Sequence, residues 1–329
     1  MEYSTTTQGP LPSTSGAETE QAAPVLSITL VVWNALPLLR DCLRSIEPEV
    51  RSGLAEVIAV DNASPDESAD VVEATLPGAT VIRTEENRGF AGGVNQAWPH
   101  VRGRYWMLLN PDATLERDGL RRLVAWMDEH PEVAIASPAL ADLDGSNRRA
   151  PIHPLPSAAL VLAEMLRLHK VLPTRLRARV FQGSYWTGGD TVEAGWVPGT
   201  AMIVRHAAAE EVGLPDESFF LYGEDIEWCW RMRRAGWRSG YCSDVAVRHA
   251  ESDTNLREYG QDETLLRMAR TELEAVRRAR GAVRARAYAA ALMLALGLEA
   301  IHPRRPQRAR ERSGAAFRAW RTAALRPRG

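Results

Sequence analysis

The residues best suited to chemistry in this chain are two neighbouring acids, Glu224 and Asp225. They follow the aromatic segment 219–222 and stand where a helix is predicted to begin. A carboxylate beside apolar rings loses hydration, so its affinity for a proton rises toward working pH. Asp225 is therefore our candidate for a general base. The alternative is that both acids only favour the positive end of a helix dipole, and the two residues taken alone favour that interpretation.

Polar residues also follow three predicted strands. The apolar runs 26–33, 57–60 and 105–109 are each succeeded by an amide or a carboxylate, namely Asn34, Asp61 and Asn110. In an open parallel sheet, ligands bind beyond the carboxyl ends of the strands, so these ends are expected to converge on one crevice. Asp61 can accept a hydrogen bond from the ring N–H of a pyrimidine, or it can close an Asx turn.

Two further segments carry groups suited to a diphosphate. In the segment 87–93, Arg88 can face a base or phosphates, and Gly89 with the later glycines lets the backbone approach a ligand closely. A plain helix-entry turn is the alternative. Asp112 follows a proline that stiffens its turn, and it can ligate a hard divalent cation that bridges diphosphate oxygens. Its alternative is a capping or turn aspartate.

Composition and charge describe a globular chain with a basic end. The 329 residues are 45% hydrophobic and 25% charged, enough for one large or two modest domains with a sizeable core. The net charge is −2, but from Asp262 onward sixteen arginines outweigh six acids, so this end carries about +10. Cys42, Cys229 and Cys242 lack the spacing of a disulfide framework or a zinc site, which indicates a reducing compartment.

The alternation of predicted strands and helices indicates an α/β fold with a doubly wound, mostly parallel sheet. Residues 1–24 are polar and lack a secretory pattern, so we expect a disordered segment and a protein that stays in the cytoplasm. A single domain is predicted over 25–260, made of a first half at 25–138, an insertion at 139–195 and a second half at 196–260. Residues 261–329 are predicted to form an arginine-rich helical tail. Its apolar run, 287–298, is too short to span a bilayer.

Six motifs, taken together and in this order, resemble the family 2 glycosyltransferases and, within them, the bacterial rhamnosyltransferase-like branch. They are 31–34 (VVWN), 60–64 (VDNAS), 87–95 (NRGFAGGVN), 109–113 (LNPDA), 195–202 (GWVPGTAM) and 219–231 (FFLYGEDIEWCWR). The resemblance covers roughly residues 26–250. Any single motif would be weak, whereas the combination is very specific.

The resemblance implies a GT-A fold, a nucleotide-sugar donor, a divalent metal (Mg²⁺ or Mn²⁺) and inversion at the anomeric carbon by one in-line displacement. It assigns the first half to the nucleotide sugar, and the insertion and second half to the acceptor. The implied donor-binding residues are Asn34, Asp61, Arg88, Gly89 and Asn110. The implied metal ligands are Asp112 and His249, the implied acceptor or sugar residues are Trp196, Gly199 and Glu224, and the implied base is Asp225. For His249 the alternative is a histidine at a strand end whose hydrogen bonds are made within the fold. For Trp196 the alternative is a core tryptophan beside a tight turn.

One departure from the family pattern concerns the metal. The usual Asp-x-Asp motif reads Asn110-Pro111-Asp112 here, so the first carboxylate is missing. One anionic ligand fewer weakens the hold on a cation before the donor arrives. We therefore expect metal binding to be coupled to donor binding.

The resemblance implies that the activity is the transfer of a sugar, L-rhamnose from dTDP-L-rhamnose, onto a hydroxyl of a lipid-linked cell-surface glycan. The tail is expected either to rest on the cytoplasmic membrane surface or to pack on the domain with a solvated basic face. Rival enzymes use another nucleotide sugar or a soluble natural product. A rival of another class is a non-catalytic scaffold of a glycan-assembly complex, although Asp112 and Asp225 are both retained. A nucleotidyltransferase would need a glycine-rich basic loop after the first strand, where Asn34-Ala35-Leu36-Pro37 stands.

No helix-turn-helix, zinc or aromatic RNA-reading pattern accompanies the basic tail, so nucleic acid is not an expected partner. The sequence contains no indication of the oligomeric state.

Overall fold

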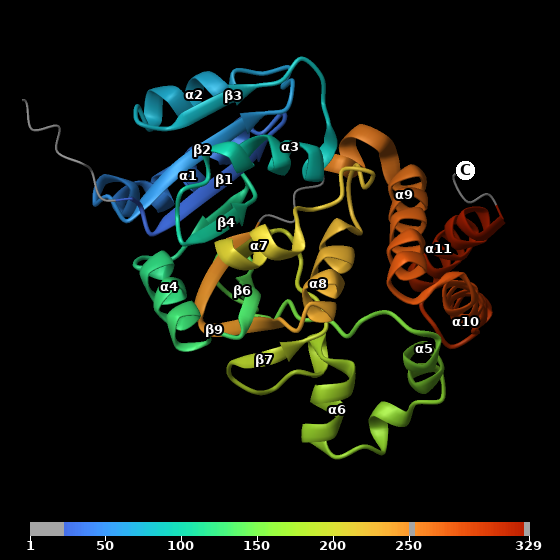
Figure 1. Cartoon of the computed structure of the whole chain (residues 1–329). Coiled ribbons are helices and arrows are strands. Elements are labelled where there is room, and N and C mark those ends of the chain that lie inside the picture. The colour runs from blue at the N-terminus through green and yellow to red at the C-terminus, as the bar shows by residue number, and fades with distance from the viewer. Residues whose placement is uncertain (1–22, 250–253, 326–329) are drawn as a thin grey trace, which may run out of the picture.

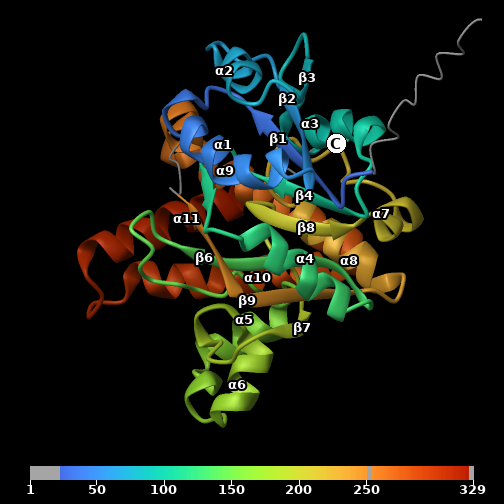
Figure 2. The ribbon, with the colours of Figure 1, turned by 90° about the vertical axis from the view of Figure 1, so that its left-hand side faces the viewer.

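A mixed β-sheet forms the centre of the protein. The computed structural model describes residues 23–249 and 254–325, so nearly all of the segment predicted to be disordered lies outside the described residues. Within them the sheet has nine strands in the order β3-β2-β1-β4-β8-β6-β9-β5, and β7 pairs with β9 (Figure 2). The strands are β1 (Leu26–Val32), β2 (Ala55–Asp61), β3 (Thr80–Arg83), β4 (Tyr105–Leu109), β5 (Ala113–Leu115), β6 (Val133–Ala141), β7 (Thr191–Ala194), β8 (Ala201–Arg205) and β9 (Arg238–His249). The predicted α/β class is confirmed.

Helices cover both faces of this sheet. Apolar side chains of α1, α2 and α4 form one core with β1 and β2, and those of α3, α7 and α8 form a second core on the opposite face (Figure 2). These helices are α1 (Leu36–Arg51), α2 (Ser68–Thr75), α3 (Gly89–Ala97), α4 (Gly119–Glu129), α7 (His206–Val212) and α8 (Glu224–Arg234). Because both faces are covered, strands such as β4 are apolar along their whole length, and all five of its residues are buried.

The sheet is mixed: its first part is parallel, and its second part is mostly antiparallel, although β6 and β9 pair in parallel. The pairings β3–β2, β2–β1 and β1–β4 are parallel, and Val32 of β1 lies opposite Asp61 of β2. The next strand, β8, joins β4 in the antiparallel direction, and β6–β8, β5–β9 and β7–β9 are also antiparallel. A buried apolar run has the same appearance in either direction, so strand periodicity alone could not reveal this change.

Local contacts set the start of two elements. Strand β8 begins only at Ala201, because Trp196 pairs with His153 in an isolated bridge and residues 198–200 turn toward β4. Helix α3 begins at Gly89, whose φ of 74° is open to glycine at little cost.

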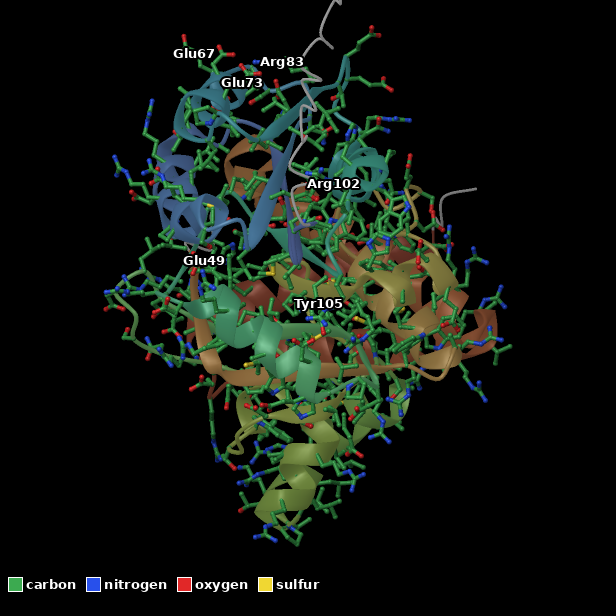
Figure 3. All side chains as sticks on the ribbon, turned by 60° about the vertical axis from the view of Figure 1, so that its left-hand side comes forward. Glu49, Glu67, Glu73, Arg83, Arg102 and Tyr105 are labelled. Carbon is green, nitrogen blue, oxygen red and sulfur yellow. The ribbon has the colours of Figure 1, made fainter. Side chains whose placement is uncertain are left out.

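At the free edge of the sheet, charge pairs join β3 to α2. Arg83 contacts Asp70 at 2.7 Å and Glu73 at 2.6 Å, and Figure 3 labels Arg83 and Glu73 at this end of the molecule. Such exposed pairs contribute little stability, but a charged edge strand resists pairing with another sheet.

The insertion and the tail form the remaining helices. The insertion holds α5 (Ala158–Met165) and α6 (Thr174–Phe181), and the tail holds α9 (Thr254–Arg280), α10 (Ala282–Ile301) and α11 (Gln307–Leu325). The three tail helices share an apolar core that includes Tyr288 and Trp320, and they stand beside α8 (Figure 1). No helix in the described part of the chain has the length and apolarity required to cross a bilayer.

The tail packs directly on the catalytic half. Ala275 of α9 is fully buried and forms a small apolar cluster with Phe219 and Ile226. A Cβ atom at Gly223, the residue that precedes α8, would lie 2.9 Å from the Thr271 carbonyl oxygen of α9. The first turn of α8 is therefore built against the tail.

Candidate functional site

The register of the sheet brings Asp112 and His249 together. Ala113 of β5 lies opposite His249 at the end of β9, so the preceding Asp112 faces the histidine. Nε2 of His249 lies 3.2 Å from Oδ1 of Asp112, and the two side chains are only 12% and 10% exposed. In the described residues Nε2 has no partner in hydrogen-bond geometry. Two buried ligand atoms thus face a common point.

This pair fits a divalent cation as a partial ligand set. A carboxylate oxygen and an imidazole nitrogen both ligate Mn²⁺, and Mg²⁺ accepts the oxygen more readily. Within residues 23–249 and 254–325, no group of three or more His, Cys, Asp or Glu side chains is arranged to hold a metal ion. Among the described residues, Asp112 and His249 thus form a set of two candidate ligands, and the coupling of metal binding to donor binding stays a prediction.

Asp225 stands in the first turn of α8 and faces the turn before β8. Its Oδ1 accepts the N–H of Ile226 at 2.8 Å. Neighbouring atoms enclose the carboxyl, although it keeps partial contact with solvent, and this burial raises its pKa to about 6. Backbone amides, among them those of Ile226 and Gly199, offset part of that rise.

The turn at residues 198–200 connects the two acidic positions. The amide of Gly199 faces the Asp225 carboxyl, and the carbonyl of Thr200 accepts the N–H of Asn110 at 2.9 Å. Asn110 precedes Asp112 by two residues and begins the turn into β5. Asp225 and the Asp112–His249 pair therefore flank the same short segment, although they are far apart in the sequence.

Two more carboxyl groups lie near Asp225. Glu224 is 6% exposed, and its Oε2 has no hydrogen-bond partner among the described residues. Burial, and then the charge of Asp225, raise the pKa of Glu224 well above its usual value. Glu272 of α9 also has a raised pKa, because burial and then the charge of Asp225 outweigh the hydrogen bond donated by the Tyr288 hydroxyl. Glu272 could not be identified from the sequence, because no local pattern distinguishes it from other acids on the helix.

The donor-binding candidates lie at the ends of β1 and β2. Oδ1 of Asp61 accepts the N–H of Ser64 at 2.8 Å, so the Asx turn named as the alternative is formed. The N–H of Asn34, which has a φ of 51°, donates to Oγ of Ser64 at 2.7 Å. One Asp61 oxygen is thus used by the fold, and Asn34 is held in a left-handed conformation beside it.

Asn62 fixes the loop that carries Arg88, and the sequence analysis had not assigned it a role. Its side chain is 2% exposed. It accepts the N–H of Arg88 at 2.9 Å and donates to the Gly89 carbonyl at 2.9 Å and to Oδ1 of Asn87 at 3.0 Å. The Arg88 side chain is 41% exposed, and its Nη2 lies 3.9 Å from Oε2 of Glu217, a contact loose enough to exchange for a phosphate. The sequence feature that could have identified Asn62 is its position directly after Asp61.

Gly89 joins the donor loop to the aromatic segment. A Cβ atom there would lie 2.1 Å from the Phe220 carbonyl oxygen, so the position requires glycine. The same carbonyl accepts the N–H of Phe90 at 2.8 Å. The Phe90 ring in turn lies 3.1 Å from the position of a Cβ on Gly199. These contacts place the loop that carries Arg88 against both the segment before Asp225 and the turn before β8.

Trp196 packs as the alternative of a core tryptophan beside a tight turn describes, and its role toward the acceptor or sugar stays a prediction. It is partly buried against the second core, and its ring stacks on His153 with the centroids 4.5 Å apart. It also packs against the small cluster that holds Phe219 and Ile226. The ring thus supports the segment between the insertion and the first turn of α8.

The chain is similar in sequence to known glycosyltransferases. The family model described as Glycosyl transferase family 2 matches residues 27–186. An N-acetylglucosaminyl-diphospho-decaprenol L-rhamnosyltransferase of Mycobacterium tuberculosis is 24% identical over 260 residues, which cover 71% of this chain and 78% of the relative. The low-salt glycan biosynthesis hexosyltransferase Agl10 of Haloferax volcanii is 26% identical over 207 residues, which cover 60% of each protein.

A solved structure shares the fold. The mannosyltransferase PcManGT of Pyrobaculum calidifontis, in complex with GDP-Man and Mn²⁺, has a TM-score of 0.57 at 18% identity and covers 92% of this chain and 87% of its own. The strand-end motifs, their convergence at one edge of the sheet and these matches agree. Residues 27–186 thus match glycosyl transferase family 2, and the chain has the GT-A fold.

Proposed function

We propose that the protein is an inverting, metal-dependent glycosyltransferase that moves L-rhamnose from dTDP-L-rhamnose onto a hydroxyl of a lipid-linked cell-surface glycan. One observation carries the proposal: Asp225 and the Asp112–His249 pair flank the same turn, residues 198–200. An inverting transfer needs a base on one side of the sugar and a countercharge for the departing diphosphate on the other. The rhamnosyltransferase from Mycobacterium tuberculosis supports the choice of sugar and acceptor.

In this proposal each residue has one task. Asp61, Arg88, Gly89, Asn34 and Asn110 bind the nucleotide part of the donor. Asp112 and His249, together with diphosphate oxygens, would hold Mg²⁺ or Mn²⁺, which supplies positive charge where negative charge develops on the leaving group. Asp225 takes the proton of the acceptor hydroxyl as its oxygen bonds to the anomeric carbon and the bond to the diphosphate breaks. Glu224, whose pKa is raised by burial, forms a hydrogen bond with a sugar hydroxyl, and Trp196 and Gly199 shape the acceptor side.

The donor is tested with a panel of nucleotide sugars, with release of nucleoside diphosphate as the readout. We expect dTDP-L-rhamnose to be turned over faster than UDP- and GDP-linked sugars. Equal or faster release from another donor would overturn the assignment of the sugar.

Calorimetry tests the metal: we expect weak Mn²⁺ binding by the protein alone and much tighter binding with dTDP present. Micromolar affinity without nucleotide would contradict the coupling.

We also propose that the protein rests on the inner face of the cell membrane through α10. The apolar residues Tyr288, Leu292 and Leu296 face the tail core, so they are not available for this role. The outward face of α10 is nevertheless apolar along its length and carries Val283, Ala287, Ala290, Leu294, Leu298 and Ile301. A surface helix that is apolar on its solvent side lacks the polar face expected in water.

Arginines stand at both ends of this outward face. Arg284 and Arg286 lie near its start, and Arg304, Arg305 and Arg308 follow its end, all of them exposed. Apolar side chains flanked by cations match an anionic lipid surface. We expect flotation with anionic vesicles, and loss of flotation in the variant Leu294→Glu, Leu298→Glu, Ile301→Glu. The control is Leu143→Glu, because Leu143 is 52% exposed but lies outside the tail.

The triple variant is preferable to removal of the tail. Ala275 and Thr271 of α9 pack on the segment around Gly223, so a shortened chain would expose the core of the catalytic half. Unchanged flotation of the triple variant would remove α10 as the membrane-binding surface.

A further inference from the structure

A cavity of about 610 Å³ lies between the aromatic segment and the three tail helices. Its walls come from residues 218–221, α9, α10 and the end of α11. We call it the tail cavity. Its size falls in the range of cavities that bind small organic ligands, about 300 to 1,000 Å³. None of the residues assigned to the donor, the metal or the base lines it.

The walls of the tail cavity combine apolar side chains with arginines. Phe220, Leu273, Ala289 and Met293 are among its apolar lining residues. Small alanines on α10 and α11 keep the space between the helices open, since a larger side chain there would fill it. An apolar space of this kind accommodates a hydrocarbon chain rather than a sugar, whose hydroxyl groups would lose their hydrogen bonds.

The charge on the cavity wall is positive and partly uncommitted. Five arginines and two glutamates line the cavity. Arg267, Arg277 and Arg278 have acidic partners within the fold. Arg270 and Arg286 make no ion pair or side-chain hydrogen bond within the described residues, and Nε of Arg270 is buried without a partner. Guanidinium groups without an acidic partner can bind a phosphate, and the neighbouring apolar side chains can contact the hydrocarbon chain attached to it.

The position of the cavity connects the active site with the membrane-facing helix. Its wall at Phe220 is the same segment whose carbonyl bonds to Phe90 beside the donor loop, and Leu221 precedes Asp225 by only four residues. Its opposite wall is α10, whose other face carries Leu294 and Leu298 outward. Figure 1 shows the tail helices between α8 and the outer surface of the molecule.

We propose that the tail cavity binds the lipid end of the acceptor, with the first part of a single hydrocarbon chain between α9, α10 and α11 and the attached phosphate or diphosphate on Arg270 and Arg286. This inference rests on the proposed function for the acceptor's role in transfer. It goes further by giving the lipid a site of its own, separate from the base and the metal ligands. The carbohydrate part of the acceptor then extends past residues 221–223 toward Asp225.

Binding can be measured without any transfer. The probe is geranylgeranyl diphosphate below its micelle concentration, titrated into the full-length protein by calorimetry, with inorganic diphosphate and geranylgeraniol as half-probes. We expect the whole probe to bind at least tenfold more tightly than either half, because the site holds both chemical parts. Equal binding of inorganic diphosphate and the whole probe would overturn the role of the apolar walls. Absence of binding by the whole probe would overturn the proposal.

Two variants locate the site. Arg270→Gln with Arg286→Gln should weaken probe binding about tenfold or more, since two charge-assisted contacts are lost. Ala282→Trp should block the cavity; Ala282 lines it but is exposed, so the substitution leaves the tail core intact. The matched controls are Arg284→Gln, an exposed arginine on α10 that does not line the cavity, and Ala125→Trp on the exposed side of α4. Equal weakening in the controls would contradict the assignment.

The failure of this proposal is distinguishable from failure of the proposed function. Hydrolysis of dTDP-L-rhamnose by the protein reports the donor site and needs no lipid. If donor hydrolysis proceeds and Ala282→Trp leaves both probe binding and transfer to a lipid-linked acceptor unchanged, the cavity assignment is wrong and the enzyme assignment stands. If the probe binds with the expected dependence on Arg270 and Arg286 but no nucleotide sugar is hydrolysed, the enzyme assignment is wrong and the lipid site stands.

Discussion

Two walls of the candidate site, which we call the strand-end wall and the helix wall, differ in whether hydrogen bonds satisfy their polar side chains. The strand-end wall, residues 61–68 and 87–89, is held by hydrogen bonds within its turns and, through Asn62, between its two segments. In it, burial alone would raise the pKa of Asp66, but hydrogen bonds from Ser64, Ser68 and the Leu36 amide outweigh burial and lower it. The helix wall consists of Glu224, Asp225 and Glu272, where burial dominates and the pKa of every carboxyl is raised.

The difference separates recognition from chemistry. A wall whose polar groups are already satisfied keeps its shape and can present a fixed surface to a nucleotide. A wall of crowded, poorly hydrated carboxyls costs stability, but the raised pKa of Asp225, about 6, lets this carboxyl accept a proton near neutral pH, as a general base requires. Changes in the strand-end wall should therefore alter donor affinity, and changes in the helix wall should alter turnover and its dependence on pH.

The largest effect is expected from Asp225→Asn. The amide keeps the size of the side chain but cannot accept the proton, so kcat should fall about 10³-fold, within the range of general-base contributions. Donor affinity should stay within a few fold, because Asp225 belongs to the helix wall. Steady-state kinetics and dTDP binding measure the two parts. Asp244→Asn, at an exposed position of β9, is the control, and unchanged turnover of Asp225→Asn would remove this residue from the role of base.

His249→Ala tests the pair that lies between the two walls. The loss of one of two protein ligands should weaken Mn²⁺ binding in the presence of dTDP about 10- to 100-fold, and high Mn²⁺ concentrations should restore part of the activity. His100→Ala is a suitable control, because His100 lies in an exposed turn away from β5 and β9. Equal metal affinity in the His249 variant and the parent would show that the histidine is only a residue at a strand end.

Asn62→Ala tests the strand-end wall. Removal of the side chain leaves the Arg88 N–H and the Gly89 carbonyl without their partner, which should cost about 1–3 kcal/mol in the free energy of unfolding. The loop then loses its fixed shape, so the donor KM should rise about tenfold while kcat changes little. Kinetics and thermal unfolding measure both quantities. A fall in kcat with an unchanged KM would contradict the division between the walls.

The contrast between the walls also explains what could be predicted from the sequence. Asp61 and Asn110 could be named as candidates because buried strands with polar ends form a recognisable pattern, and Arg88 and Gly89 because they stand in a glycine-rich segment; their roles stay predictions. The contacts that hold this wall, such as those of Asn62 with Arg88 and Gly89, join residues far apart in the chain and could not be predicted. The antiparallel direction of β8 could not be predicted, because apolar periodicity does not encode strand direction.

The helix wall was only half predictable. Glu224 and Asp225 stood out beside the aromatic segment, but Glu272 comes from α9, an arginine-rich helix whose packing face depends on tertiary contacts. For the same reason the sequence left open whether the tail rests on a membrane or packs on the domain, and in the structure Tyr288 and Leu292 face the tail core. A helix with apolar residues on all sides does not reveal which side will be buried.

The smallest expected effect concerns Glu272. Because Asp225 must be deprotonated to act and its pKa is about 6, kcat/KM should rise with pH up to that value and fall about tenfold for each unit below it. Ionised Glu272 and ionised Asp225 repel each other, so Glu272→Gln should make Asp225 easier to ionise and move this rising limb to lower pH. The control Glu274→Gln removes an acid two residues away that is paired with Arg277 and Arg278.

Stability gives an independent readout of the same variant. A carboxyl whose pKa is raised by folding stabilises the folded state at low pH, and this contribution is lost as pH rises through the raised value. Replacement of Glu272 by the neutral amide removes that loss, so the Tm of Glu272→Gln relative to the parent should increase between pH 4 and pH 8. If the rising limb moves without this trend in Tm, Glu272 acts on Asp225 by a route other than charge. If neither moves, the tail contributes packing but no electrostatic influence to the helix wall.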